Sequence, residues 1–112
     1  KKIIEKAIKT TNLNEYVISA TKYKHPIERS FRKLKKKINI NFPKYLNCRT
    51  QDIPASYHDA AQFYFANKKV WINKKKIISN KSSFIELPQI SSQDIDTIED
   101  WKTAEIIWKI TN

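Results

Sequence analysis

Apolar side chains recur at helical intervals of three and four in the first ten residues of the chain. Four positions make up this stripe: Ile3, Ile4, Ala7 and Ile8. The spacing predicts an amphipathic helix over residues 1–10 that ends near Asn12. Residues 16–20 are almost continuously apolar, which is typical of a strand buried on both faces of a parallel sheet. A helix that leads into such a strand predicts an α/β fold, in which the neighbouring strands need not all come from this chain.

The pattern is interrupted at His25 and Pro26 and is then ambiguous. In residues 27–34 the apolar positions fit a helix, but they also alternate with polar positions as in a strand. Residues 38–42 alternate cleanly, and lysines at positions 35–37 separate the two stretches. We favour a β-hairpin over residues 27–42 with a lysine-rich turn, and we interpret His25 as a polar turn residue.

Three short elements are predicted between residues 62 and 88. Aromatic and β-branched residues indicate strands at residues 62–65 and 84–88. Between these strands, Asn67 is placed to cap a short helix that carries residues 70–72.

The last predicted element is a helix that begins after Thr97. Threonine is a typical N-cap residue, and Asp100 stands three residues later, as in a capping box. We expect the apolar face of this helix to dock onto the protein core. That face consists of Trp101, Ala104, Ile107 and Trp108.

Asp94 and Asp96 precede this helix and are the leading candidates for chemistry. In an extended segment successive side chains alternate, so both carboxylates would point to one side while Ile95 points into the protein. Two converging carboxylates suit a hard cation such as Mg²⁺, which takes oxygen ligands and keeps room for water and substrate phosphates. Two solvated acids ahead of a surface helix would give the same pattern, so the pair needs further support.

Polar residues suited to ligand recognition crowd between residues 47 and 65. They are Arg49, Gln51, Asp52, His58, Asp59 and Gln62, interleaved with small and aromatic residues. An arginine in such a setting can clamp a carboxylate through two parallel hydrogen bonds. A polar surface loop that leads into an edge strand would have the same composition, and the spacing does not choose between these two interpretations.

The formal net charge of the 112 residues is +11, which invites a nucleic-acid interpretation. The charge is unevenly distributed, however. Residues 1–37 hold 12 Lys and Arg against 3 acids, residues 38–81 hold 8 against 2, and residues 82–112 hold 2 against 6. Lys, Ile and Asn are all abundant, as drift toward AT-rich codons would produce. We therefore interpret the basic surface mainly as solvated lysines and place nucleic-acid binding second.

Composition also bears on the setting of the protein. No apolar run is long enough to span a membrane, and no signal peptide is recognisable. Cys48 is the single cysteine, so no intrachain disulfide can form, as expected of a cytoplasmic protein. Phosphate-binding glycine loops are absent because the chain contains no glycine. The absence of methionine leads us to expect a segment of a longer protein.

Ordered motifs across nearly the whole chain resemble those of the acylneuraminate cytidylyltransferases. The matching stretches are residues 19–21, 26–27, 42–45, 49–52, 57–64, 86–88, 93–97 and 99–101. Several motifs in the family's order and with its gaps make chance similarity a poor explanation. Within the family the chain looks most like the pseudaminic acid branch.

The resemblance implies the C-terminal half of a Rossmann-like nucleotidyltransferase fold, with residues 1–112 as one segment and residues 27–42 as a hairpin used in dimerisation. Enzymes of this family transfer CMP from CTP to a nonulosonic acid and release pyrophosphate with Mg²⁺. The implied partners are therefore CTP, a nonulosonic acid such as pseudaminic acid, and a second copy of the chain in a homodimer. Neither a membrane nor nucleic acid is implied.

Site residues carry over from the family motif by motif. Asp94 and Asp96 would hold the metal and act as the catalytic residues. The substrate-binding residues would be Arg49, Gln51, Asp52, His58 and Gln62. Arg49 would pair with the sugar carboxylate, and His58 would act as a base or only as a hydrogen-bond donor.

The chain also departs from the family pattern. Ala61 and the turn at residues 35–37 stand where the family usually has glycine, and residues 89–92 replace an arginine-bearing stretch. The family's nucleotide-binding loop, rich in Gly, Arg and Lys, is missing. We therefore expect the chain alone to be inactive. The alternatives are a non-catalytic remnant kept for dimerisation or binding and, less favoured, a basic nucleic-acid-binding domain.

Overall fold

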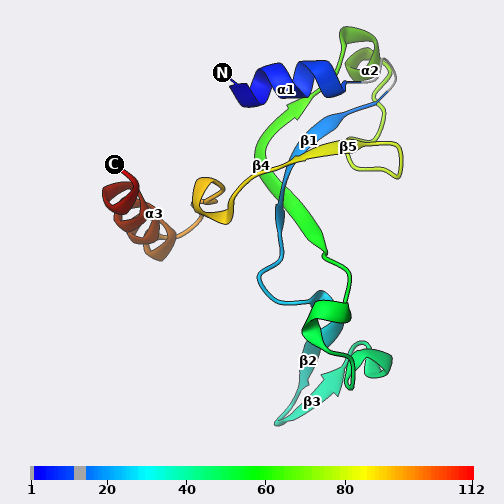
Figure 1. The fold of residues 1–112 in the computed structure, drawn as a ribbon, viewed down its shortest axis with the longest axis vertical. Coiled ribbons are helices and arrows are strands. Elements are labelled where there is room, and N and C mark those ends of the chain that lie inside the picture. Colours follow the sequence, from blue (N-terminus) through cyan, green and yellow to red (C-terminus); the bar gives the residue numbers. More distant parts are fainter. Residues whose placement is uncertain (1, 12–14) are drawn as a thin grey trace. The chain divides into compact units, whose positions relative to one another are not determined.

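The computed structural model describes residues 2–11 and 15–112, so the predicted helix end near Asn12, like Lys1, lies outside the described residues. It is a mixed α/β structure with two small sheets (Figure 1). The chain divides into two compact units. One unit consists of Lys1–Thr21 with Asp59–Asn112, and the other of Lys22–His58.

The first unit is built on a three-stranded sheet in the order β4–β1–β5. β1 (Val17–Lys22) is central and lies parallel to β5 (Ser83–Glu86), with Val17 opposite Ser83 and Ala20 opposite Glu86. β4 (Tyr57–Phe65) lies on the other side of β1. The predicted buried strand with a parallel neighbour is therefore confirmed, and both of its neighbours come from this chain.

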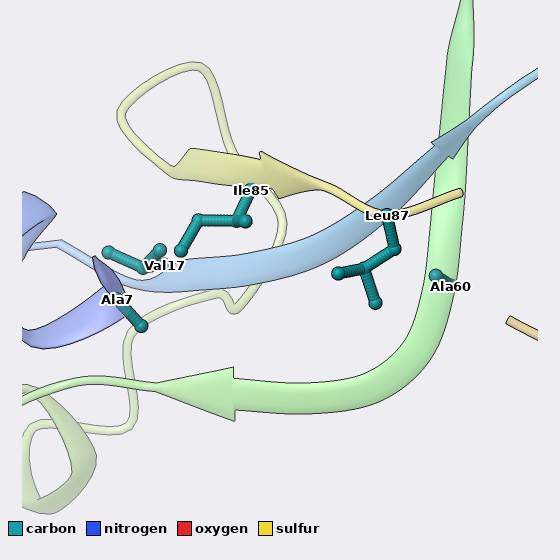
Figure 2. Packing of buried hydrophobic residues seen from close by; sticks show 5 residues of the cluster. All are labelled: Ala7, Val17, Ala60, Ile85 and Leu87. Carbon is teal, nitrogen blue, oxygen red and sulfur yellow. The ribbon is translucent and has the colours of Figure 1, made fainter. Parts of the chain in front are cut away.

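The two faces of β1 bury different clusters of side chains. Val17 lies with Ala7 of α1 (Lys2–Thr10) on one face, and Figure 2 shows this cluster. Tyr16 and Ile18 lie with Val70 of α2 (Lys68–Ile72) in the other cluster. Successive residues of a strand point to opposite faces, so one helix covers each face of the sheet. The first cluster consists of Ala7, Val17, Ala60, Ile85 and Leu87.

Both of these helices follow from residues close to them in the sequence. α1 forms as predicted, but Ala7 is its only buried residue and its isoleucines remain about half exposed. Asn67 caps α2 as predicted, because its side chain accepts a hydrogen bond from the Val70 backbone N–H at 3.1 Å.

β4 is irregular near its middle, and it begins at Tyr57 rather than at the predicted residue 62. Ala61 has a φ of 52°, in the left-handed region that favours glycine. The N–H of Ala61 donates to the Asp59 carboxylate, and those of Gln62 and Phe63 both donate to the buried Ser19 hydroxyl, at 2.9 and 3.1 Å. The strand bends just beyond Ala60 (Figure 2), as strands do where the regular ladder is interrupted.

The second unit contains the predicted hairpin. β2 (Phe31–Leu34) and β3 (Lys37–Ile40) are antiparallel, with Phe31 opposite Ile40 and Leu34 opposite Lys37. Lys35 lies in the two-residue turn with a φ of 57°. The hairpin with a lysine-rich turn is thus confirmed, over residues 31–40 rather than the predicted 27–42. In residues 27–34, where a helix was the alternative, the structure has one 3-10 turn at Ile27–Arg29 followed by β2.

α3 (Ile98–Thr111) begins at the predicted cap, but the prediction that its apolar face docks onto the core was wrong. None of its residues is buried, and Trp101 and Trp108 are 57% and 66% exposed. Ile95, expected to point inward, is 47% exposed. The physical reason is that, among residues 2–11 and 15–112, both buried clusters are formed by the sheet, α1, α2 and adjoining loops and neither includes a residue of α3. Among the described residues no helix is long and apolar enough to cross a membrane.

Candidate functional site

The segment that carries Asp94 and Asp96 is anchored on the N-terminus of α3. Asp100 Oδ2 accepts hydrogen bonds from the Thr97 backbone N–H at 2.8 Å and from the Asp96 N–H at 3.3 Å. The Thr97 hydroxyl in turn accepts from the Asp100 N–H at 3.2 Å, which completes the predicted capping box. Hydrogen bonds from Thr97 hold the pKa of the Asp100 carboxyl below its ordinary value. The cap therefore fixes the backbone of Asp96 relative to the helix.

Asp94 and Asp96 are both exposed, in an irregular segment between a 3-10 turn (Gln89–Ser91) and α3. No group of three or more His, Cys, Asp or Glu that could hold a metal occurs among residues 2–11 and 15–112. Two exposed carboxylates are nevertheless a donor set that Mg²⁺ uses where substrate phosphates and water complete its shell. The pair fits such a cation only as part of a larger site.

Asp59 and Tyr64 of β4 form a hydrogen-bonded pair that the sequence did not suggest. The Tyr64 hydroxyl donates to Asp59 Oδ2 at 2.5 Å, across the bend of β4. This hydrogen bond, burial and the charges of Asp59 and Asp94 together raise the pKa of Tyr64. Asp94 contributes to this shift through its charge, after the effects of Asp59 and of burial. This hydrogen bond depends on the bend of β4 at Ala61, and the sequence carries no glycine that would have indicated a bend there.

The second unit contains a cleft of about 440 Å³. One wall comes from residues 22–26 and the other from residues 50–56. The Tyr23 N–H donates to the Ser56 carbonyl at 2.9 Å and ties the two walls together. Ile53, which is 7% exposed, supplies a buried apolar side chain to the lining.

The predicted substrate-binding residues fall in both units. Arg49 precedes a 3-10 turn (Thr50–Asp52) and is exposed, as are Gln51 and Asp52. Among the predicted residues only Gln51 lines the cleft. The His58 ring lies 4.8 Å from that of Tyr23, at an interplanar angle of 55°.

Gln62 belongs to the other unit, with Asp94 and Asp96. Its side-chain amide donates to the Ala60 carbonyl at 3.0 Å. The sequence did not single out Lys22 and Lys24, which line the cleft of the second unit. Residues 22–26 and 50–56 are far apart along the chain, and only the fold brings them together.

Sequence comparison finds close relatives but no family model that matches the chain. The chain is 34% identical over 102 residues to pseudaminic acid cytidylyltransferase of Campylobacter jejuni serotype O:2, in an alignment that covers 90% of this chain and 44% of that protein. The enzyme of the same name from serotype O:23/36 is 33% identical with the same coverage. A third relative, from Helicobacter pylori, is named pseudaminic acid cytidylyltransferase and UDP-2,4-diacetamido-2,4,6-trideoxy-beta-L-altropyranose hydrolase. It is 31% identical over 97 residues, which are 84% of this chain and 19% of that protein.

The chain thus spans less than half the length of the curated relatives that it matches. The matched region includes most of the chain, so the similarity does not rest on one motif. The family resemblance drawn from the sequence is confirmed, and the chain is a relative of the pseudaminic acid cytidylyltransferases over 90% of its length.

Proposed function

We propose that the chain forms the sugar-binding and metal-binding half of a CMP-nonulosonic acid synthetase with a Rossmann-like fold. The enzyme would transfer CMP from CTP to pseudaminic acid or a related sialic-type acid and release pyrophosphate. The observation that carries this proposal is the 34% identity to a protein named for this reaction, over 90% of the chain. The α/β arrangement of unit 1, with a helix on each face of a partly parallel sheet, is compatible with it.

In this reaction the anomeric hydroxyl of the sugar attacks the α-phosphorus of CTP, in line with the leaving pyrophosphate. Catalysis of this kind consists mostly of positioning and of neutralising charge on the phosphate oxygens. A Mg²⁺ ion held by Asp94 and Asp96 would supply that neutralisation and lower the pKa of the attacking hydroxyl. The Thr97–Asp100 capping box fixes the backbone of Asp96 at the start of α3.

The residues that the family resemblance implies for sugar binding would contribute polar side chains. Four of them, Arg49, Gln51, Asp52 and His58, belong to the unit Lys22–His58. The His58 imidazole packs against the Tyr23 ring. His58 would act on the sugar either as a hydrogen-bond donor or as a base.

The nucleotide-binding half would be a separate part of the complete enzyme, because the relatives are more than twice as long as the matched region. A groove of about 370 Å³ along α3, lined by Ile95, Trp101, Ala104 and Trp108, offers an uncovered apolar surface. Exposed apolar surfaces of this kind mark interaction sites. We propose that the nucleotide-binding half covers this groove.

A second copy of the chain would associate through the hairpin. The register places Phe31 opposite Ile40 and Lys33 opposite Ile38, so three apolar side chains share one face. Phe31 and Ile38 are 58% and 62% exposed. If this face is an interface, the double variant Phe31→Ser/Ile38→Ser should sediment as a monomer under conditions where the unmodified protein is a dimer. A clean monomer of the unmodified complete enzyme at high concentration would reject the dimer.

The proposed function is tested by reconstitution. The 112-residue chain would replace the matching region of the Campylobacter jejuni relative, and pyrophosphate release from CTP would be measured with pseudaminic acid and with N-acetylneuraminic acid. We expect activity from the folded chimera and none from the 112-residue chain alone. A folded chimera that is inactive with both sugars, or robust CMP transfer by the chain alone, would contradict the proposal.

A further inference from the structure

The chain carries no acidic residue between Asp59 and Glu86. This stretch holds six lysines and no arginine, and all six lysines lie in α2 or in the loop that joins α2 to β5. Each of them is exposed. They are Lys68, Lys69, Lys74, Lys75, Lys76 and Lys81. The first unit holds twelve Lys and Arg in total, so residues 68–81, which we call the lysine segment, contain half of its positive charges.

Apolar side chains are exposed within the same lysine segment. Trp71 is 45% exposed, Ile72 64% and Ile78 60%. Two other apolar residues attach the segment to the fold, since Val70 is buried and Ile77 packs against the cluster that contains it. The segment therefore presents one set of apolar side chains to the core and another set to solvent, next to the lysines.

Serine hydrogen bonds define the loop that follows α2. The Ser82 hydroxyl donates to the Ile77 carbonyl at 2.6 Å and accepts from the Ser79 N–H at 3.2 Å. The Lys81 N–H donates to the Ser79 hydroxyl at 3.2 Å, and the Ser82 N–H donates to the Ser79 carbonyl at 3.0 Å. The exposed lysines and isoleucines are therefore displayed from a structured loop.

The lysine segment leads into the amino end of β5. The Ser83 N–H at this end donates to the carbonyl of Tyr16, the residue before β1, at 2.9 Å. Asp94 and Asp96 follow the opposite, carboxyl end of β5. Ligands of open α/β sheets bind outside the carboxyl ends of the strands. A partner at the lysine segment is therefore compatible with chemistry at the other end of β5.

We propose that the lysine segment binds the surface of an anionic lipid bilayer. The lysines contact the anionic headgroups, while Trp71, Ile72 and Ile78 enter the boundary between headgroups and acyl chains. Tryptophan is enriched at this depth of the membrane. A nucleic acid fits less well, because the segment has no arginine and because a phosphate backbone offers no apolar surface to the two isoleucines. This proposal does not rest on the proposed function.

The test uses the purified 112-residue chain with Trp101→Phe and Trp108→Phe, which leaves Trp71 as its single tryptophan. Binding to phosphatidylcholine vesicles, with and without phosphatidylglycerol, would be measured by cosedimentation. Vesicles with brominated acyl chains would report the depth of Trp71, because bromine quenches tryptophan fluorescence at close range. Duplex DNA and single-stranded RNA serve as the competing ligands.

Two variants of the lysine segment separate charge from apolar contact. Lys74→Gln/Lys76→Gln/Lys81→Gln removes three charges, and Ile72→Ser/Ile78→Ser removes two apolar side chains. All five side chains are exposed, so we expect both variants to fold, with thermal unfolding as the check. If the isoleucine variant does not fold, the lysine variant and the quenching of Trp71 still decide the question.

The control variant is Lys33→Gln/Lys36→Gln/Lys37→Gln. It removes the same charge from exposed positions of the β2–β3 hairpin in the other unit. Comparison with this control separates binding by the lysine segment from adsorption that depends only on net charge.

We expect phosphatidylglycerol to strengthen vesicle binding at least 30-fold and brominated chains to quench Trp71. A lysine at an anionic surface contributes about fivefold, so the lysine variant should weaken binding at least 30-fold, and added salt should weaken binding further. The isoleucine variant should weaken it at least tenfold, and the control by less than about threefold. The same ranking should hold in the longer chimera with the Campylobacter jejuni relative, whether or not that chimera is active.

Four results would overturn the proposal. An equal loss in the control variant would show adsorption by net charge alone. Unquenched Trp71, or vesicle binding that requires Trp101 and Trp108, would place the contact elsewhere. Lysine-dependent binding of DNA or RNA without binding of anionic vesicles would make the partner a nucleic acid. Loss of vesicle binding in the folded chimera would show that the complete enzyme covers the lysine segment.

Discussion

Ala61→Gly should stabilise the protein, although glycine usually weakens a strand. With a φ of 52°, Ala61 occupies the left-handed region, which costs an L-residue about 1–2 kcal/mol. Glycine removes that cost but loses roughly 0.5–1 kcal/mol through its larger freedom in the unfolded chain. Because Ala61 is exposed, little methyl burial is lost. The net gain should be about 0.5–1 kcal/mol, or roughly 2–4 °C in Tm for a chain of this size.

The neighbouring residue provides a matched control. Ala60 is 4% exposed and belongs to the cluster around Val17, so Ala60→Gly removes a buried methyl group and should destabilise by about 1–2 kcal/mol. Both variants would be unfolded in urea and by heat and followed by tryptophan fluorescence, to which Trp71 contributes from its contact with the buried Tyr16. If Ala61→Gly destabilises as much as Ala60→Gly, the left-handed conformation at Ala61 and the bend built on it are refuted.

Three further predictions concern single hydrogen-bonded groups. Ser19→Ala should destabilise by about 2–3 kcal/mol, because it removes the acceptor of two N–H groups of β4, and unchanged urea unfolding would contradict this. The pKa of Tyr64 is raised, chiefly by Asp59, so the stability that this tyrosine contributes should be present below its ordinary pKa near 10.0 and be lost as the pH rises through the raised pKa. The titration of Tyr64 would be followed as the difference in absorbance at 295 nm between the protein and its Tyr64→Phe variant. The pKa measured in this way should fall in the Asp59→Asn background and fall by less in the Asp94→Asn background. The lowered pKa of Asp100 should stabilise the start of α3 above its ordinary value near 3.8 and cease to do so as the pH falls through the lowered value, so circular dichroism of Asp100→Asn should lack this acid-dependent loss of helix.

Features set by neighbouring residues were predicted well from the sequence. The caps at Asn67 and Thr97 depend on one side chain and a backbone group three residues away. The hairpin depends on alternation and a short turn, and the buried strand at β1 on a continuous apolar run. In each case the interacting residues are close together in the sequence, or the alternation of apolar and polar residues is enough to predict the element.

Features that need a distant surface were not predicted. The apolar face of α3 looks like a core-facing helix, but no described element covers it, and a pattern cannot show that its partner surface is lacking. The contact between Tyr64 and Asp59 depends on a bend at an alanine that no glycine announces. The cleft lysines depend on the backbone bond between Tyr23 and Ser56, across more than thirty residues of chain.

The aspartate pair is the most direct test of the proposed synthetase. In the active chimera, Asp94→Asn and Asp96→Asn would each keep the size of the side chain and remove the charge that a hard cation needs. The exposed Glu99→Gln, in the first turn of α3, is the matched control for loss of a nearby negative charge. CMP transfer would be measured at saturating CTP and sugar over a wide range of Mg²⁺ concentrations, with thermal unfolding as the check of the fold. We predict a fall in kcat of on the order of 100-fold or more for each asparagine variant and less than about threefold for the control, because loss of metal stabilisation amounts to several kcal/mol. Near-normal transfer by either folded asparagine variant at saturating Mg²⁺ would show that the pair is only a polar surface feature and that the metal assignment is wrong.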